Sequence, residues 1–207
     1  MRTAIIGAGQ VGPALAKNLA AAGHDVVVGT RDPEGAAATS ARATLGDVPV
    51  VAIADALSGA DAVVLAVPGA AMDDFIATHG AALEGKLVMD AANRVGGSLA
   101  EQKPMNSCAE LVAAAPSAAV YRAFNSLGWE NFAEPVIDGV QADLLFAGPA
   151  SRRQQAEELI TAVGLRPVWV GDLDKVGLVD ALAALWGSLA YGQDLGRRLF
   201  FKVVTPS

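Results

Sequence analysis

The fold is decided by residues 3–12, which read Thr-Ala-Ile-Ile-Gly-Ala-Gly-Gln-Val-Gly. The apolar run 4–6 predicts a short strand, and Gly7, Gly9 and Gly12 follow it with the spacing GxGxxG. The first glycine allows a tight turn, the second lets the backbone approach a pyrophosphate, and the third lets helix and strand pack closely. This stretch therefore predicts the opening of a dinucleotide-binding βαβ unit.

The residues after the glycines complete this unit. We expect an amphipathic helix over Gln10–Ala22, a stop at Gly23-His24 and a second strand at Val26–Val28. GxGxxG alone is weak evidence, but here the flanking elements fall where the unit needs them. The pyrophosphate would lie at the positive end of the helix. The predicted contacts of this loop are Gly7, Gly9, Gln10, Val11 and Gly12.

The end of the second strand indicates which dinucleotide binds. In NAD-dependent enzymes an acidic residue about 20 positions past the glycines holds the ribose 2′-hydroxyl. Here that position is Thr30, 23 residues after Gly7 (30 − 7 = 23), and Arg31 follows it. A guanidinium suits a 2′-phosphate, whereas a carboxylate would repel it. We therefore predict NADP(H), held by Thr30 and Arg31; the alternative is that Arg31 is merely solvated. Asp32 is expected to cap the next turn.

Composition limits the classes of function. The chain has 207 residues, 53% of them hydrophobic, with a formal net charge of −7 and no basic run, which disfavours nucleic-acid binding. One cysteine, Cys108, allows no intrachain disulfide and fits a reducing compartment. No apolar run reaches the roughly 18 residues of a membrane span, and the N-terminal apolar segment reads as a strand rather than a signal peptide. We predict a cytoplasmic protein without nucleic-acid or membrane partners.

Strand-like and helix-like segments alternate through the first 125 residues, which predicts a doubly wound parallel sheet of the Rossmann type. The expected strands are Val48–Ile53, Ala62–Ala66, Leu87–Asp90 and Ala119–Phe124. The expected helices are Glu34–Leu45, Ala54–Ser58, Ala71–His79 and Ser107–Ala115, the last with Ser107 as N-cap and Glu110 three residues on.

The pattern changes near residue 125. Asn125–Gly139 is irregular, and Leu144–Ala147, Arg152–Val163 and Pro167–Val170 predict a further strand, helix and strand. A long helical tract is expected from about Lys175 to Val203, interrupted by glycines at 187, 192 and 196. We therefore predict two domains. Residues 1–125 form the NADP-binding domain, and residues 126–207 form a small C-terminal α/β lobe that completes the substrate cleft and is a candidate oligomer interface. Whether the late strands extend the first sheet stays open.

In open parallel sheets ligands bind outside the C-terminal ends of the strands. Asn93 and Asn125 are amides at two such ends and are candidates to hold the nicotinamide carboxamide or a substrate carbonyl; the alternative is that each caps a turn. The further cofactor contacts predicted at these strand ends are Ala66, Val67, Pro68, Ala91 and Asn93.

Few residues offer acid–base or metal chemistry. His24 and His79 are expected to be structural, and with one cysteine they give no metal-ligand spacing. Tyr121 and Tyr191 lack a YxxxK context. A ketone reductase needs a proton donor near the hydride acceptor, whereas transfer between two redox coenzymes needs mainly two rings held roughly 3–3.5 Å apart. No catalytic acid or base is therefore assigned, and Asn93 and Asn125 are predicted to act by positioning.

Several motifs together resemble one known family, the NADPH-dependent reductases of the deazaflavin coenzyme F-420. The resemblance spans nearly the whole chain, and its most distinctive segment is Ala-Phe-Asn-Ser-Leu-Gly-Trp at residues 123–129. The other similar segments are Gly7–Gly12, Gly29–Arg31, Ala66–Pro68, Asp90–Asn93 and Leu185–Arg197.

The resemblance implies hydride transfer between NADP(H) and coenzyme F-420 as co-substrate, in a homo-oligomer that we expect to be a dimer. It places the deazaflavin near Asn125, Ser126 and Trp129. The sequence departs from the family at Ala92-Asn93-Arg94, where archaeal members often carry Thr-Asn-Pro, and in the Gly-rich loop 95–104. Two alternatives stay open. One is an NADPH-dependent reductase of a small imine, carbonyl or metal chelate, similar to pyrroline-carboxylate reductases and ferric reductase domains. The other is a non-catalytic NADP-binding sensor or interaction protein.

Overall fold

The computed structural model describes residues 1–95 and 104–206. Their main sheet has six parallel strands in the order β3-β2-β1-β4-β5-β6. The strand order reverses between β1 and β4, which confirms the predicted doubly wound fold and sets the point where ligands bind. The strands are β1 (Arg2–Ile6), β2 (Asp25–Thr30), β3 (Val50–Ala52), β4 (Ala62–Leu65), β5 (Leu87–Asp90) and β6 (Ala119–Arg122).

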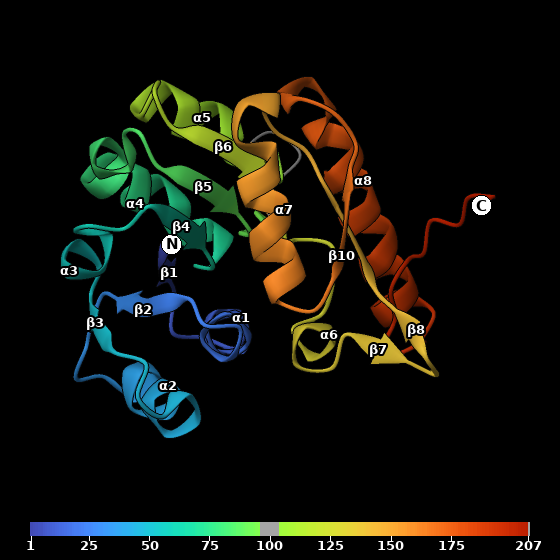
Figure 1. The fold of residues 1–207 in the computed structure, drawn as a ribbon, viewed down its shortest axis with the longest axis horizontal. Helices are drawn as coiled ribbons and strands as arrows, with labels where there is room; N and C mark the ends of the chain where they lie inside the picture. The colour runs from blue at the N-terminus through green and yellow to red at the C-terminus, as the bar shows by residue number, and fades with distance from the viewer. Residues whose placement is uncertain (96–103, 207) are drawn as a thin grey trace.

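Helices cover both faces of this sheet (Figure 1). The helices α1 and α2 cover one face, where Leu15 of α1 and Val28 of β2 share a core. The helices α3, α4 and α5 cover the other face, where Met72 of α4 and Leu111 of α5 share a second core. Because both faces are covered, the strands read as continuous apolar runs. The helices are α1 (Val11–Ala21), α2 (Ala36–Leu45), α3 (Ile53–Leu57), α4 (Met72–His79) and α5 (Cys108–Ala114), with short 3-10 turns η1 (Gly69–Ala71) and η2 (Gly80–Leu83).

The C-terminal part lies beside β6 (Figure 1). Its strands β9 and β10 form their own parallel pair, and a single antiparallel bridge between Arg122 and Ala147 joins β6 to the end of β9. The late strands therefore do not continue the main parallel sheet. The elements are α6 (Glu130–Ala133), β7 (Val136–Ile137), β8 (Val140–Gln141), β9 (Asp143–Phe146), η4 (Ala150–Arg152), α7 (Arg153–Ala162), β10 (Arg166–Trp169), η5 (Leu173–Lys175), α8 (Val176–Gly187) and the π-helical η6 (Ser188–Gly192).

The helical tract predicted over 175–203 is wrong after Gly192. α8 ends at Gly187, one π-helical stretch follows, and the chain after Gly192 is not helical. Asp194 (φ 53°) and Gly196 (φ 76°) adopt left-handed backbone conformations, which a right-handed helix cannot contain. The tail then folds back, because Asn131 Nδ2 donates to the Arg197 carbonyl at 2.9 Å.

Two local predictions also differ from the structure. The strand expected over Ala119–Phe124 ends at Arg122, because Phe124 has a φ of 63° and turns the chain. Ser107 does not cap α5 with its side chain; the Asn106 side chain accepts from Cys108 N–H instead, at 3.0 Å. The cap expected at Asp32 is confirmed: in the turn after β2, Asp32 Oδ1 accepts from Glu34 N–H at 3.1 Å.

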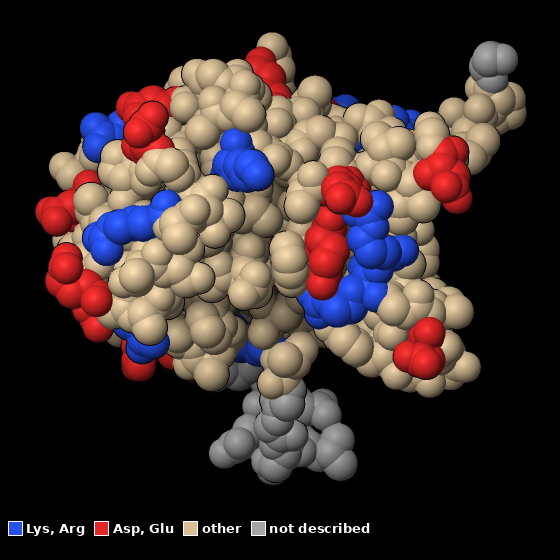
Figure 2. Space-filling model, turned by 90° about the horizontal axis from the view of Figure 1, so that it is seen from below, with Lys and Arg blue, Asp and Glu red and all other residues tan. Residues whose placement is uncertain are grey.

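Within the described residues, no helix is both long and apolar enough to cross a bilayer. On the face drawn in Figure 2, Lys and Arg side chains form several separate patches interspersed with Asp and Glu.

Candidate functional site

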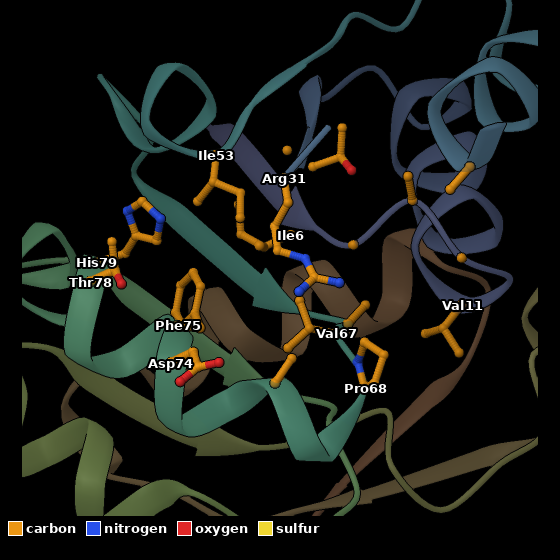
Figure 3. Close-up of a pocket in the computed structure, with 18 of the residues that line it drawn as sticks. Ile6, Val11, Arg31, Ile53, Val67, Pro68, Asp74, Phe75, Thr78 and His79 are labelled. Carbon is orange, nitrogen blue, oxygen red and sulfur yellow. The ribbon is translucent and has the colours of Figure 1, made fainter. Parts of the chain in front are cut away.

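The carboxyl ends of β1, β2 and β4 surround a cleft of about 690 Å³ (Figure 3). Backbone hydrogen bonds continue past the strands and hold the following loops side by side. Gly7 N–H donates to Gly29 at 2.9 Å, and Ala66 N–H donates to Ile6 at 2.8 Å. These two hydrogen bonds fix the relative positions of the loops that form the floor of the cleft.

The glycine loop can take this course only because side chains are missing. Gly7 has a φ of 129°, and a Cβ atom on it would lie 2.3 Å from the Ala66 carbonyl oxygen. A Cβ atom on Gly12 would lie 1.8 Å from the Gly7 carbonyl oxygen. A Cβ atom on Gly9 would meet nothing within 4 Å, so this position leaves open space at the cleft. The three glycines thus provide a turn, a close approach and room for a ligand.

The N-terminus of α1 is free to bind an anion. This 11-residue helix has no acidic residue in its first turn, and Gln10 at the N-cap makes no side-chain capping bond. The first backbone N–H groups of a helix have no partner within it, and the helix dipole adds positive potential there. A pyrophosphate group in the cleft would meet both.

The end of β2 contributes a cation to the same cleft. Arg31 is exposed, and within residues 1–95 and 104–206 no hydrogen bond or ion pair involving it is found. Figure 3 shows its side chain reaching across the cleft toward Val67. Thr30 lies beside it on the lining. A hydroxyl and an unused guanidinium are suited to a phosphate monoester.

The cleft brings together most of the predicted cofactor contacts. Gly12 packs beneath the loop rather than on the surface of the cleft, and Ala91 and Asn93 lie outside its lining. The predicted contacts that do line it are Gly7, Gly9, Gln10, Val11, Thr30, Arg31, Ala66, Val67 and Pro68.

One wall of the cleft was not predicted from the sequence. It is one face of α4 and the turn before it, together with Ile53 at the start of α3. The residues of that face follow the helical spacing i, i+3, i+4, i+7 and i+8, which is the signal that would have found them. They are Ala71, Asp74, Phe75, Thr78 and His79. His79, expected to be structural, therefore lies at the site.

Asn93 belongs to a buried polar cluster beside the cleft. Its Oδ1 accepts from Arg122 Nη2, and its Nδ2 donates to the Asn125 carbonyl at 2.9 Å. With its amide oxygen turned toward Arg122, Asn125 accepts from Nη2 at 3.2 Å. An amide nitrogen carries two N–H groups, so one on Asn93 is left for a ligand. We call Asp90, Asn93, Arg122, Asn125 and Asp180 the Arg122 cluster.

Arg122 is fully buried and joins the sheet to the C-terminal lobe. Its Nε donates to Asp180 of α8 at 2.8 Å, its Nη1 lies 3.3 Å from Asp90 Oδ2, and it also donates to the Ala92 carbonyl. Burial raises the pKa of the Asp90 carboxyl, although Arg122 and the Ser107 N–H oppose that shift. The cluster therefore stabilises the loop that follows β5.

The predicted acceptor contacts do not line the cleft: Asn125 belongs to the Arg122 cluster, and Ser126 and Trp129 follow it in the chain. Ser126 is buried, and Trp129 is half-buried at the N-terminus of α6, packed against the main core. Phe124 stands before them in its left-handed turn, with its ring edge-to-face against Phe132 at 5.8 Å. The loop 95–104, where the second substrate was expected to dock, lies largely outside the described residues, since 96–103 are not described.

The described residues around the site offer no activated nucleophile or acid. Burial raises the pKa of the Cys108 thiol, which keeps it protonated. Burial also raises the pKa of Tyr121 to about 12, and its hydroxyl donates to the Pro149 carbonyl. No metal-binding group of His, Cys, Asp or Glu occurs among the described residues.

A family model described as NADP oxidoreductase, coenzyme F-420-dependent, matches residues 2–94, which run from β1 through the loop after β5. No curated protein matches the chain.

Solved structures extend the likeness beyond that range. A protein described as a candidate F-420-dependent NADP reductase from an Arthrobacter species is 25% identical, with a TM-score of 0.84 over 98% of this chain and 99% of that chain. A hypothetical protein from Sinorhizobium meliloti is 32% identical, with a TM-score of 0.70 over 86% and 88%. An imine reductase from a Pseudomonas species, 15% identical with a TM-score of 0.66 over 89% and 61%, shares the fold alone.

Proposed function

This chain belongs to the family of coenzyme F-420-dependent NADP oxidoreductases, and on that premise we propose that it transfers hydride between NADP(H) and a deazaflavin of the F-420 type. The observation that carries the proposal is the single cleft that unites the glycine loop, the uncapped N-terminus of α1 and the unpaired Arg31 guanidinium. A dinucleotide with an extra phosphate needs these three features together.

The residues of the chain fit NADP(H) by their own chemistry. The loop from Gly7 to Gly12 presents backbone N–H groups to the pyrophosphate, and Thr30 with Arg31 offers a hydroxyl and a cation to the 2′-phosphate. When bound, the nicotinamide supplies or accepts the hydride. We infer that Val67 and Pro68 exclude water from one side of that ring.

Asn93 is proposed as a positioning residue at the nicotinamide end. Its amide is held on two sides by Arg122 and Asn125, so its remaining N–H has a fixed direction. Asn125, Ser126 and Trp129 are proposed to border the acceptor, because they follow β6 at the same edge of the sheet. Orientation of two flat rings would then supply most of the rate.

Rapid mixing with NADPH and oxidised F-420 tests the reaction. We expect the deazaflavin absorbance band to bleach within the first turnover, because NADPH supplies the hydride and water supplies the proton, so that no proton donor is needed from the protein. The matched control is the same mixing with NADH, which should bleach the band more slowly. NADPH binding without any bleaching would contradict the deazaflavin assignment while leaving the coenzyme assignment intact.

Assays with other acceptors, on the same protein preparation, distinguish two rival functions. If NADPH reduces a small cyclic imine and not F-420, the imine reductase alternative holds; its support here is the shared fold of the Pseudomonas protein. If NADPH binds but no acceptor from a broad panel oxidises it, the chain is a sensor or interaction protein.

Replacing Arg31 with alanine is expected to weaken NADPH binding by about 1.5–3 kcal/mol, or about 10- to 150-fold, because a charge-assisted contact to the 2′-phosphate is lost. The affinity for NADH should change little. Calorimetric titration of both coenzymes measures this. Arg2→Ala, which removes a cation at the amino end of β1, is the matched control and should leave both affinities unchanged. Equal losses for NADH and NADPH in Arg31→Ala would refute the assignment.

We also propose that the chain forms a homodimer. The support is that Leu178 and Leu185 of α8 and Tyr191 just after it are 61%, 49% and 63% exposed, and large apolar side chains of this kind are enriched at subunit interfaces. Sedimentation velocity should give twice the mass of one chain, and Leu185→Glu should shift the protein toward monomer. A wild-type monomer at high micromolar concentration would overturn this proposal.

A further inference from the structure

The α4 wall of the cleft carries a carboxylate where the coenzyme would bring negative charge. Asp74 is exposed, lines the cleft and points into it beside the Phe75 ring (Figure 3). No hydrogen bond or ion pair involving Asp74 is found among the described residues. The nearby carboxylates of Asp73 and Glu110, in contrast, both pair with Arg94. An acid that faces a phosphate-binding cleft weakens binding unless the ligand offers it a hydrogen-bond donor.

The surroundings of Asp74 suit a flat base. Ile6, Ile53 and Phe75 are at most 8% exposed and present apolar surface to this part of the cleft. Figure 3 shows Ile53 and Phe75 facing each other across it, with Arg31 on the side of the glycine loop. Aromatic bases are held between apolar side chains of this kind.

We propose that Asp74 determines the base specificity of the coenzyme site, by accepting a hydrogen bond from the exocyclic amino group of adenine. This inference rests on the proposed binding of NADP(H) in the same cleft. Among the groups of the adenosine half, the amino group and the ribose hydroxyl are the donors. The ribose belongs next to its 2′-phosphate, at Thr30 and Arg31 on the end of β2. The amino group is the donor that reaches the opposite wall.

Asp74 therefore adds selectivity rather than overall attraction. Its charge repels the phosphates of every nucleotide equally and so weakens their binding. Only a base with an amino group at that position regains the lost binding free energy. Arg31 selects the 2′-phosphate, and Asp74 selects the base. The two selections act at different ends of the adenosine half of the cleft.

A double-mutant cycle between protein and ligand tests the proposal. The ligand pair is NADPH and the analogue in which purine replaces adenine, so that hydrogen stands where the amino group was. Wild-type protein should bind NADPH at least about tenfold more tightly than the purine analogue, since a charge-assisted hydrogen bond is lost. In Asp74→Ala the two affinities should agree within about twofold, because the acceptor is gone. Any general effect of the removed charge cancels in the ratio.

The control variant is Asp55→Ala, which removes an exposed carboxylate on the neighbouring α3, outside the lining of the cleft. It should keep the wild-type ratio. A wild-type ratio near one, with NADPH still bound tightly, overturns the role of Asp74 alone. A ratio that persists in Asp74→Ala also overturns it. Failure of wild-type protein to bind either ligand overturns the proposed function itself, so the two failures are told apart.

Discussion

Replacement of Gly12 with alanine is expected to lower NADPH affinity by about a hundredfold or more. The new Cβ atom would stand 1.8 Å from the Gly7 carbonyl oxygen, a distance that no packing tolerates, so the loop must move away from α1. That movement misdirects the backbone N–H groups that meet the pyrophosphate. Losing two charge-assisted hydrogen bonds of about 1.5–3 kcal/mol each gives the stated effect. Calorimetric titration with NADPH measures it.

Two further glycine variants separate loop geometry from general helix stability. Gly9→Ala places its Cβ atom in open space, so the free energy of unfolding should hardly change while NADPH binding weakens. Gly177→Ala in α8 meets nothing within 4 Å and should raise stability slightly, by up to about 1 kcal/mol, without affecting binding. If Gly12→Ala bound NADPH as well as the wild type, the glycine loop would not be the pyrophosphate site.

The second large effect is expected at Arg122. Arg122→Met should lower the free energy of unfolding by about 3–5 kcal/mol, because it leaves a buried carboxylate without its counter-charge. Asp90 is fully buried and lies 3.3 Å from the guanidinium, and the Ala92 carbonyl and the Asn93 amide lose a donor at the same time. Urea unfolding followed by circular dichroism measures the change.

A second arginine, Arg153, provides the control for this prediction. Arg153 of α7 pairs with Glu157 and lies 4.6 Å from the centre of the Trp169 ring, so Arg153→Met should cost no more than about 1–2 kcal/mol. Adding Asp90→Asn to Arg122→Met should recover part of the loss, since the unpaired charge is removed. A cost below about 1 kcal/mol for Arg122→Met would show that the Arg122 cluster does not hold the two parts of the chain together.

Local patterns in the sequence predict the first half of this fold well. The strand ending at Ile6, the glycine spacing and the helix that follows depend on neighbouring residues, so their physical causes are visible within a short window. The place of Arg31 at the cleft was predictable for the same reason, because its distance from Gly7 is set by one helix and one strand, whereas its contact with the coenzyme stays a prediction. The parallel pairing of the strands follows from the alternation of strands and helices.

Features that depend on contacts between distant residues were not predictable. Arg122 reads as part of a strand, and only the folded chain brings it to Asp180, 58 residues later. Asp74, Thr78 and His79 share one helical face, but this spacing alone does not show that the face lines the cleft, because that depends on what the folded chain places opposite it. The end of α8 was misplaced because apolar residues continue past Gly187, while left-handed turns at Asp194 and Gly196 decide the path. The boundary at residue 125 between the two predicted domains stays a prediction.

The central claim is that this cleft binds NADP(H) and recognises its 2′-phosphate through Arg31. Calorimetric titration of the purified wild-type chain with NADPH and with NADH, at equal ionic strength, tests it most directly. We predict that NADPH binds with one site per chain and at least about tenfold more tightly than NADH. Equal affinities for the two coenzymes, or no heat of binding from either, would contradict the account.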